Sequence, residues 1–494
     1  MSVKRKSVCV IGAGVSGLAA ARAFRSHGHQ VTIIEREQNL GGVWDPARSY
    51  PDVQTQSPKD LYRYTDQAMP DDYPEWPKGG QVHQYLASFA DKNGLRPLIR
   101  YGATVRNMSR VQGGGWTVTL EQNGKTVDEH FDFVAVATGQ FSEINMPEFP
   151  GAEAFRANGG AILHSSQYTD PTVVKGKNVV VLGFSKSATD IAVNAARSGA
   201  KQVSIVYREP MWRIPYFIGG LINFKRILYI RAQENMFPAW AQTPLQKINH
   251  AIAKPFIWAN WRGLESLLNL QLGLSKHGMR PKVRIEDNIN CSVPIVTPDF
   301  FPLLKQGKIR AYQGTFAEYG QGEVKLTGGQ SVPADIAILA TGWKQGVPFL
   351  SNENSAKLVE PDGQHRLYRN IVNPDLADLG FVGFNSSFAT VLSADLAAHW
   401  LVRYADGKLA RQPTASQMSA TIADMLHWRR EVRPAAGAYG GLCIAPYHFK
   451  HFDELIDDIG ATVKRRNPLA ERFTPPDAAA FGRYLASAPH YVAQ

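Results

Sequence analysis

The sequence has few cysteines and no long apolar run. Cys9, Cys291 and Cys443 are the only cysteines among 494 residues, and no two of them form a Cys-x-x-Cys pair. This count excludes a disulfide scaffold, a cysteine-based zinc site and a redox-active cysteine pair, and it favours a reducing compartment. No run of 18 uncharged apolar residues occurs, so we expect no transmembrane helix and a cytoplasmic protein.

Concentrated charge is also missing. The net charge is +11, but the basic residues are scattered, and the densest basic run, at 464–466, holds only three. No nucleic-acid-binding motif occurs, so we expect no nucleic-acid partner and interpret the positive charge as suited to a polyanionic cofactor. Histidines and cysteines do not occur at metal-ligand spacing, so no metal site is predicted.

What the sequence does contain is a dinucleotide-binding pattern near its N-terminus. Residues 8–11 predict a buried strand, 12–17 read Gly-Ala-Gly-Val-Ser-Gly, 18–24 predict an alanine-rich helix, and 31–34 predict a strand that ends at Glu35. Strand, GxGxxG loop, helix, strand and acid in this order form the Rossmann fingerprint. The alternative, a glycine-rich turn in an ordinary α/β domain, does not account for the acid.

Each fingerprint residue has a physical task. Gly12 permits the tight turn, Gly14 lets a pyrophosphate approach the backbone, and Gly17 lets the helix pack close to the strand. The helix N-terminus offers free N–H groups to the phosphates. Glu35 can accept hydrogen bonds from ribose hydroxyls, so the sequence predicts a bound dinucleotide.

A second, degenerate fingerprint follows in the middle of the chain. It comprises a predicted strand at 178–182, the loop Gly-Phe-Ser-Lys-Ser-Ala at 183–188, a helix at 189–198 and a strand at 203–207. The residue after this strand is Arg208, which can bind a 2′-phosphate through two hydrogen bonds where an acid would repel it. The second nucleotide is therefore predicted to be NADPH, and a plain surface charge is the alternative interpretation of Arg208.

Each fingerprint is followed by a strand that ends on Ala-Thr-Gly, at 137–139 and at 340–342. This repeat predicts an α/β fold with two Rossmann-like dinucleotide-binding domains. Gly41-Gly42 follows Glu35 after a short loop, a pattern typical of FAD in flavoproteins with two such domains, so we expect the NADPH domain to be inserted in an FAD domain. We place the first part of the FAD domain at 1–165, the NADPH domain at 166–330, and the return with C-terminal helices at 331–494.

An aromatic and basic insertion at about 210–298 lengthens the second repeat. We expect its helices to be interrupted at Pro238, Pro244 and Pro255. Most of its aromatic residues are predicted to lie in a core or along a substrate tunnel, an interpretation that we favour over a membrane surface. Further predicted elements are a loop at 50–73, helices at 81–90, 393–404 and from 447, and strands at 102–105, 115–120, 131–137 and 379–384.

Several segments together carry a resemblance to a family. They are Leu-Gly-Gly-Val-Trp at 40–44, Ala-Thr-Gly-Trp at 340–343, Leu-Tyr-Arg-Asn-Ile-Val-Asn-Pro at 367–374 and Tyr-His-Phe-Lys-His-Phe-Asp-Glu-Leu at 447–455. With the two fingerprints they resemble the flavin-containing monooxygenases, class B flavin enzymes that use FAD and NADPH, from residue 8 to about residue 460.

The family signature FxGxxxHxxx(Y/F) precedes the second fingerprint. Gly160, His164 and Tyr168 stand at its spacing, but Asn158 holds the place of the first aromatic, and Phe155 lies three residues too early. The related Baeyer–Villiger enzymes end the signature in Trp, so Tyr168 argues against them. His164 is expected to act as a hinge or linker, with direct cofactor contact as the alternative.

The resemblance implies where FAD and NADPH bind and how they react. NADPH reduces FAD, and reduced FAD with O2 gives a C4a-hydroperoxyflavin that oxygenates a nucleophilic nitrogen or sulfur of a small substrate. The implied cofactor-binding residues are Gly12, Gly14, Ser16, Gly17, Glu35, Gly42, Val43, Trp44, Val105, Thr138, Gly139, His164, Tyr168, Gly183, Ser185, Lys186, Ser187, Arg208, Thr341 and Gly342.

The candidate catalytic residue is Gln56. The family often has Thr-Asn in the loop over the flavin, and this chain has Thr55-Gln56. Expected partners are a small-molecule substrate and O2, while a homodimer and a peripheral membrane contact stay open. Three other functions also stay open: N-hydroxylation of a specific biosynthetic amine, Baeyer–Villiger oxidation of ketones, and nucleotide binding without turnover.

Overall fold

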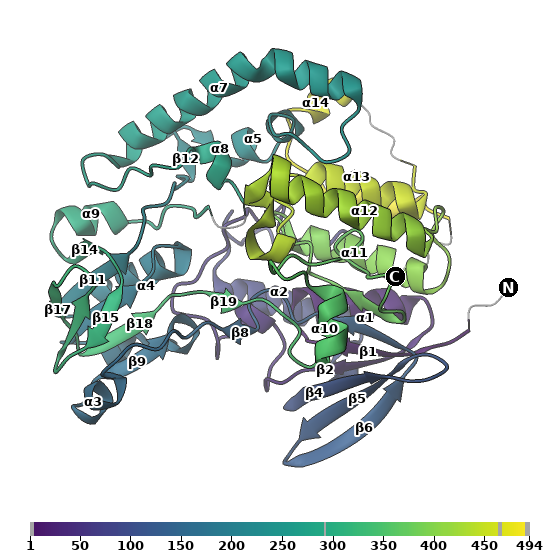
Figure 1. Cartoon of the computed structure of the whole chain (residues 1–494), viewed down its shortest axis with the longest axis horizontal. Coiled ribbons are helices and arrows are strands. Elements are labelled where there is room, and N and C mark those ends of the chain that lie inside the picture. The colour runs from purple at the N-terminus through teal and green to yellow at the C-terminus, as the bar shows by residue number, and fades with distance from the viewer. Residues whose placement is uncertain (1–3, 291–292, 463–466, 490–494) are drawn as a thin grey trace.

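Two five-stranded parallel sheets organise the molecule (Figure 1). The computed structural model describes residues 4–290, 293–462 and 467–489. Buried apolar runs form the strands, as expected where helices cover both faces of a parallel sheet. The first sheet has the order β20 (Leu379–Phe381), β7 (Phe133–Val136), β1 (Ser7–Ile11), β2 (Gln30–Ile34) and β3 (Ile99–Arg100).

The second sheet repeats the order of the first. Its strands run β9 (Ala161–His164), β18 (Ile336–Leu339), β10 (Asn178–Leu182), β11 (Gln202–Tyr207) and β14 (Ile309–Gln313). Each fingerprint strand, β1 or β10, lies between the strand that ends on Ala-Thr-Gly and the strand that precedes Glu35 or Arg208. The predicted pair of Rossmann-like domains is thus confirmed.

Each domain also carries a three-stranded antiparallel sheet. The first contains β4 (Ala103–Arg110), β5 (Trp116–Gln122) and β6 (Lys125–Phe131), and the second contains β15 (Phe316–Tyr319), β16 (Glu323–Leu326) and β17 (Ser331–Pro333). The remaining short strands are β8 (Glu143–Ile144), β12 (Phe217–Ile218), β13 (Ile222–Asn223) and β19 (Trp343–Lys344).

The chain leaves the first domain through β8 and returns to it through β19. These two strands pair as antiparallel neighbours, so both crossings lie side by side. The second sheet extends beyond the limits 166 and 330 that the sequence suggested, since β9 and β18 belong to it. We therefore propose domain limits at β8 and β19.

Cys9 is free and buried and Cys443 is disulfide-bonded, whereas Cys291 and the basic run 464–466 lie outside the described residues.

The insertion is helical, but two of its prolines do not interrupt helices as predicted. It contains α5 (Lys225–Leu228), α6 (Arg231–Glu234), α7 (Pro244–Leu272) and α8 (Ile285–Asn288). Pro244 begins α7 behind the Thr243 cap, where a missing N–H costs nothing, and Pro255 lies inside the 29-residue helix. Because the first half of α7 is exposed, water can solvate the carbonyl that Pro255 leaves without an N–H partner.

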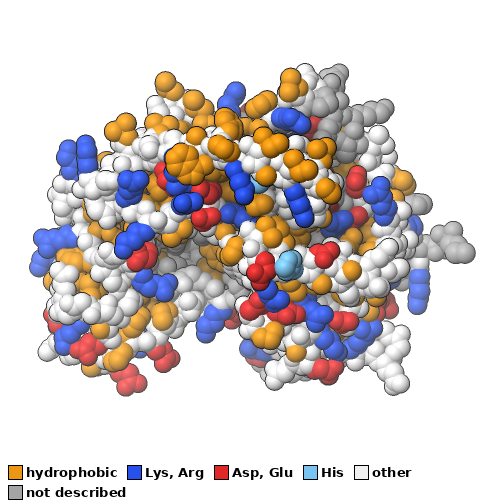
Figure 2. Space-filling view, turned by 45° about the horizontal axis from the view of Figure 1, so that its top comes forward, with side chains coloured by type: hydrophobic (Ala, Val, Ile, Leu, Met, Phe, Trp, Pro, Cys, Tyr) orange, Lys and Arg blue, Asp and Glu red, His pale blue; other side chains and the backbone are white. Residues whose placement is uncertain are grey.

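The packing of the insertion confirms most of the expected core. Trp212, Phe224, Phe237 and Trp261 are buried, whereas Phe256 and Trp258 on α7 are exposed. Hydrophobic side chains gather on the face of the molecule that carries α7 (Figure 2). Among the described residues no helix is both long and apolar enough to cross a membrane.

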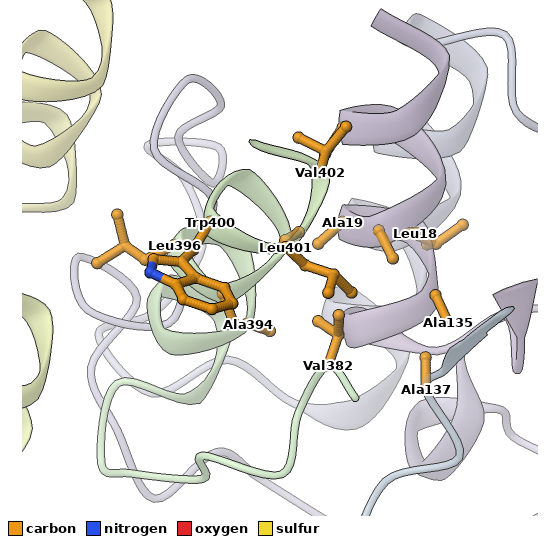
Figure 3. Packing of buried hydrophobic residues seen from close by; sticks show 14 of the residues in the cluster. Leu18, Ala19, Ala135, Ala137, Val382, Ala394, Leu396, Trp400, Leu401 and Val402 are labelled. Carbon is orange, nitrogen blue, oxygen red and sulfur yellow. The ribbon is translucent and has the colours of Figure 1, made fainter. Parts of the chain in front are cut away.

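The core of the first domain sits between α1 (Val15–Ser26), α11 (Thr390–Ala405) and the first sheet. Leu18 and Ala19 of α1 face Leu401 and Val402 of α11, and Val382 lies below them (Figure 3). The other α-helices are α2 (Gly79–Lys92), α3 (Ala152–Ala157), α4 (Lys186–Arg197), α9 (Phe300–Lys305), α10 (Asn352–Leu358), α12 (Ala415–His427), α13 (His448–Ile459), α14 (Pro468–Glu471) and α15 (Ala478–Ala486).

Candidate functional site

The three fingerprint glycines differ in how much room surrounds them. Gly12 has φ +109°, and a Cβ there would lie 2.7 Å from the Ala137 carbonyl oxygen. A Cβ on Gly17 would lie 1.8 Å from the Gly12 carbonyl oxygen, so α1 packs directly on the turn. A Cβ on Gly14 would meet nothing closer than Gly42 Cα at 3.6 Å, which leaves this glycine free for a ligand's approach.

The Glu35 carboxylate is aimed at the same loop. Its Oε2 accepts a hydrogen bond from the Ala13 N–H at 2.7 Å, and its Oε1 accepts one from the Glu37 N–H at 2.9 Å. Burial raises the pKa of this carboxyl, and the two N–H donors oppose that rise. The carboxylate therefore has a fixed orientation beside the loop, as ribose recognition requires.

The segment after Glu35 closes over the fingerprint. Gly42, Val43 and Trp44 form a 3-10 turn, and the Gly41 N–H donates to the Ala13 carbonyl at 3.0 Å. Trp44 is buried and donates from Nε1 to the Tyr62 hydroxyl at 2.8 Å, while Val43 is exposed. Val105 lies in β4, a strand whose first residue donates its N–H to the Glu35 carbonyl.

Three buried polar atoms near this end of the sheet have no hydrogen-bond partner among the described residues. They are Thr55 Oγ1, Thr138 Oγ1 and Asn385 Oδ1. Thr138 follows β7 and precedes Gly139, which has φ +70°. Unsatisfied buried polar groups are rare, and a polar cofactor would satisfy them. The residues present therefore fit a flavin dinucleotide along the first fingerprint.

One contact here was not found from the sequence. Gly383 has φ +88°, and a Cβ on it would lie 2.2 Å from Ser16 Oγ. The segment after β20 thus returns against the fingerprint helix. Only the glycine itself could have signalled this, because the two residues lie far apart in the sequence and no local spacing joins them.

The second fingerprint copies the first in its backbone. A Cβ on Gly183 would lie 2.5 Å from the Ala340 carbonyl oxygen, just as a Cβ on Gly12 would lie 2.7 Å from the Ala137 carbonyl oxygen. Ser185 stands at the N-terminus of α4 with Ser187 Oγ 3.5 Å from its own Oγ. Ala188 takes the place of Gly17 and is buried, so this helix leaves room for a Cβ.

The two candidate phosphate-binding cations are placed differently. Lys186 is buried, with Nζ 2.5 Å from Asp190 Oδ1 and 3.4 Å from Thr297 Oγ1. Arg208 is exposed at the end of β11, and no ion pair to its side chain is formed within the described parts of the chain. Arg208 is therefore the cation that is available to a 2′-phosphate.

The signature residues hold the second domain together. His164 Nε2 lies 3.1 Å from the Gly342 carbonyl oxygen, and Nδ1 lies 2.9 Å from Ser166 Oγ. Burial lowers the pKa of His164, which favours the neutral ring. Tyr168 is buried, and its hydroxyl donates to Asn194 Oδ1 at 2.7 Å. These contacts place His164 at the crossing between domains and Tyr168 in the domain core.

The displaced aromatic has a structural explanation. Phe155 lies in α3, and a Cβ on Gly160 would come within 2.3 Å of its ring. Phe155 and Asn158 are three residues apart, so they lie on one helical face. The ring therefore packs on Gly160 from one turn earlier. Thr341 Oγ1 donates to the Asn145 carbonyl at 2.5 Å, beside Gly342 at the crossing.

The loop at 50–57 connects the two nucleotide sites. The Tyr50 hydroxyl donates to Asp190 Oδ2 at 3.0 Å, and Asn194 Nδ2 donates to Asp52 Oδ2 at 2.7 Å. Gln56 is half-buried, and its Oε1 accepts a hydrogen bond from the Ile295 N–H of the insertion at 3.0 Å. Gln56 thus lies between the domains with its carbonyl engaged.

An apolar cavity begins beside this loop. Ile295 and Phe388 line it, and Ser57 Oγ donates to the Phe388 carbonyl. The remaining lining residues are Ile214, Phe224, Leu228, Tyr229, Gln233, Phe237, Trp261, Ile289, Val293 and Pro446. No carboxylate, histidine, lysine, arginine or cysteine is among these described residues, so the cavity offers no strong acid or base.

Comparisons with known proteins agree with this geometry. The family model described as flavin-binding monooxygenase-like matches residues 5–464. A probable flavin-containing monooxygenase 1 of Arabidopsis thaliana is 28% identical over 95% of this chain and 94% of its own length.

Solved structures show the same fold. The S-allyl-L-cysteine S-oxygenase of Allium sativum is 21% identical, with a TM-score of 0.62 and 98% of each chain covered. A structure named OTEMO, in complex with FAD and NADP, is 17% identical, with a TM-score of 0.67 over 92% of this chain and 98% of that one. Because the family model spans nearly the whole chain, this protein belongs to the flavin-binding monooxygenase-like family and is a flavin monooxygenase.

Proposed function

We propose that this enzyme uses NADPH and O2 to oxygenate a nucleophilic nitrogen or sulfur of a small, largely apolar substrate. The observation that carries the proposal is the cavity beside Gln56, whose described lining residues include no strong acid or base. A soft amine or thioether supplies its own electron pair and needs no general base. The sulfur substrate in the name of the Allium enzyme agrees with this choice.

The chain's own residues divide the task. Along the first fingerprint, Glu35 and the loop backbone bind FAD, and along the second, α4 and Arg208 bind NADPH. Bound flavin supplies hydride acceptance and reaction with O2. The apolar insertion excludes water from the cavity, which protects the reaction from wasteful loss of oxygen as peroxide.

Oxygen uptake and product analysis test this function. The purified flavoprotein should consume O2 only when NADPH is present and should convert a thioether to its sulfoxide or a tertiary amine to its N-oxide, as identified by mass spectrometry. Formation of an ester or lactone from a ketone, with no N- or S-oxide from any amine or sulfide, would contradict the proposal.

Gln56 is the first residue to test. Gln56→Ala should keep FAD and accept hydride from NADPH, because neither step needs this amide. Product per NADPH should fall several-fold and hydrogen peroxide should rise, since an amide displaced by about 1 Å already matters for catalysis. The measurement is the ratio of product, peroxide and NADPH consumed.

Gln56→Glu is the matched control. Its carboxylate still accepts the Ile295 N–H but cannot donate a hydrogen bond toward the site. If Glu restores coupling, Gln56 acts by holding the insertion on the loop. If both variants couple as well as the wild type, Gln56 has no role in oxygen transfer.

We also propose that α7 lies on an anionic membrane surface. Leu245, Ile248, Ile252 and Phe256 are 55–74% exposed and fall on one helical face. The exposed Lys247 and Lys254 lie on the opposite side of α7, so the expected preference for anionic headgroups rests on the net charge of +11. The hydrophobic face in Figure 2 carries this helix.

Co-sedimentation with vesicles that contain phosphatidylserine measures this contact. The wild type should pellet with these vesicles, and Ile252→Asp should reduce the bound fraction at least about fivefold. Val127→Asp, at an exposed position on β6, is the control and should bind normally. If the protein does not bind vesicles and its molecular mass in solution is twice that of one chain, the apolar face of α7 would instead be a homodimer interface.

A further inference from the structure

Among the described residues that line the apolar cavity, one carries a side-chain amide, and the nitrogen of this amide has no hydrogen-bond partner. Gln233 of α6 lines the cavity and is 5% exposed. Its Nε2 has no hydrogen-bond partner among the residues that the structure describes. A buried N–H donor without an acceptor is costly, so an unsatisfied amide at a cavity wall calls for an explanation.

Strong contacts on either side hold Gln233 in this position. Arg231 donates to both carboxylate oxygens of Asp453, at 2.7 and 2.9 Å. Glu234 accepts the N–H groups of Phe449 and Lys450, at 2.9 and 2.8 Å, where α13 begins. These contacts fix the backbone of α6 on either side of Gln233 and so keep this residue at the cavity wall.

Among the described residues the rest of the wall is mostly apolar, and none of it forms a hydrogen bond with Gln233 Nε2. Leu228, Phe237, Trp261 and Ile289 are apolar, and the Tyr229 hydroxyl is engaged with Ser57. A ligand in this cavity would therefore be largely apolar. It would gain one directed interaction if it carried a hydrogen-bond acceptor at the Gln233 end.

We propose that Gln233 is a specificity-determining residue whose Nε2 donates a hydrogen bond to an oxygen acceptor of the ligand, such as a carbonyl or ether oxygen. This inference rests on the function proposed above. It implies that the substrate is a thioether or tertiary amine that is largely apolar and also carries such an oxygen. A ligand of the same shape without this oxygen would leave the buried N–H donor unpaired, so the site should bind it more weakly.

Calorimetric binding of two isosteric probes tests the hydrogen bond without turnover. Acetophenone carries a carbonyl where α-methylstyrene carries a methylene group, and both are titrated into the flavoprotein in the absence of NADPH. The ratio of the two Kd values, compared between wild type and Gln233→Leu, cancels the difference in hydration of the probes. We expect the ratio of the α-methylstyrene Kd to the acetophenone Kd to be at least about fivefold larger in the wild type than in Gln233→Leu.

The variants include two controls. Gln233→Met keeps an unbranched side chain of similar length, and it should lose the preference as Gln233→Leu does, so a poorly folded Leu variant leaves the test intact. Gln330→Leu, at an exposed position far from the cavity lining, should bind as the wild type does. The same ratio in wild type, Gln233→Leu and Gln233→Met, or no binding of either probe, would overturn the proposal. Because no turnover is measured, this result is separate from whether the enzyme oxygenates sulfur or nitrogen.

Discussion

Gly17→Ala should yield almost no folded flavoprotein. The added methyl group would lie 1.8 Å from the oxygen and 2.8 Å from the carbon of the Gly12 carbonyl, and both of these atoms belong to the backbone. Gly12 has little room to retreat, because the space beside it is so narrow that a Cβ there would lie 2.7 Å from the Ala137 carbonyl oxygen, and its φ is +109°. Overpacking costs about 1–3 kcal/mol when side chains can shift, and here they cannot, so we expect a loss of at least about 3 kcal/mol.

Flavin absorbance per mole of protein and the thermal unfolding midpoint measure this effect. Gly14→Ala is the matched control, because its Cβ meets Gly42 Cα at an ordinary 3.6 Å. That variant should keep its fold yet lose FAD, since the methyl group lies where a pyrophosphate approaches the backbone. A Gly17→Ala protein with normal flavin content and normal melting would refute the packing argument.

Arg208→Ala should raise the KM for NADPH far more than the KM for NADH. The guanidinium is exposed after β11 and not paired by another described side chain, so its hydrogen bonds are free for a 2′-phosphate. A charged hydrogen bond contributes about 1.5–3 kcal/mol, which corresponds to roughly 10- to 150-fold in KM. Steady-state kinetics with both coenzymes measures the difference.

Arg208→Lys separates charge from geometry. Lysine keeps the positive charge but loses the two-pronged donor arrangement, so it should recover only part of the NADPH preference. Equal changes in the two KM values for Arg208→Ala would assign the phosphate to another residue. Lys186 is a poor candidate for that role because Asp190 already neutralises it.

The elements that the sequence predicted correctly are those that local pattern determines. The apolar run at 8–11 became β1, and the alanine-rich segment after Gly17 became part of α1. A buried parallel strand and a helix that packs closely on it have distinctive compositions. The repeat of these patterns predicted two dinucleotide-binding domains, and the structure shows the same strand order in both sheets.

The features that were missed depend on contacts between distant segments. Pro255 predicted a helix end, but α7 continues, and its exposed first half lets water solvate the carbonyl that the proline leaves without an N–H partner. Phe155 stands at the wrong position for the signature, yet helical geometry brings its ring to Gly160. The engagement of Gln56 with Ile295 could not be predicted, because no spacing reports which backbone N–H a loop will meet.

The paired crossing at β8 and β19 has a consequence for how such a protein is assembled in evolution. Asn145 and Thr341 bond to each other, so the two ends of the intervening segment lie side by side. A segment with adjacent ends behaves as a cassette, which a single recombination event can move between genes without rethreading the host domain. The loop at 50–57 would then have to co-evolve with any new cassette, since Tyr50 and Asp52 reach residues within it.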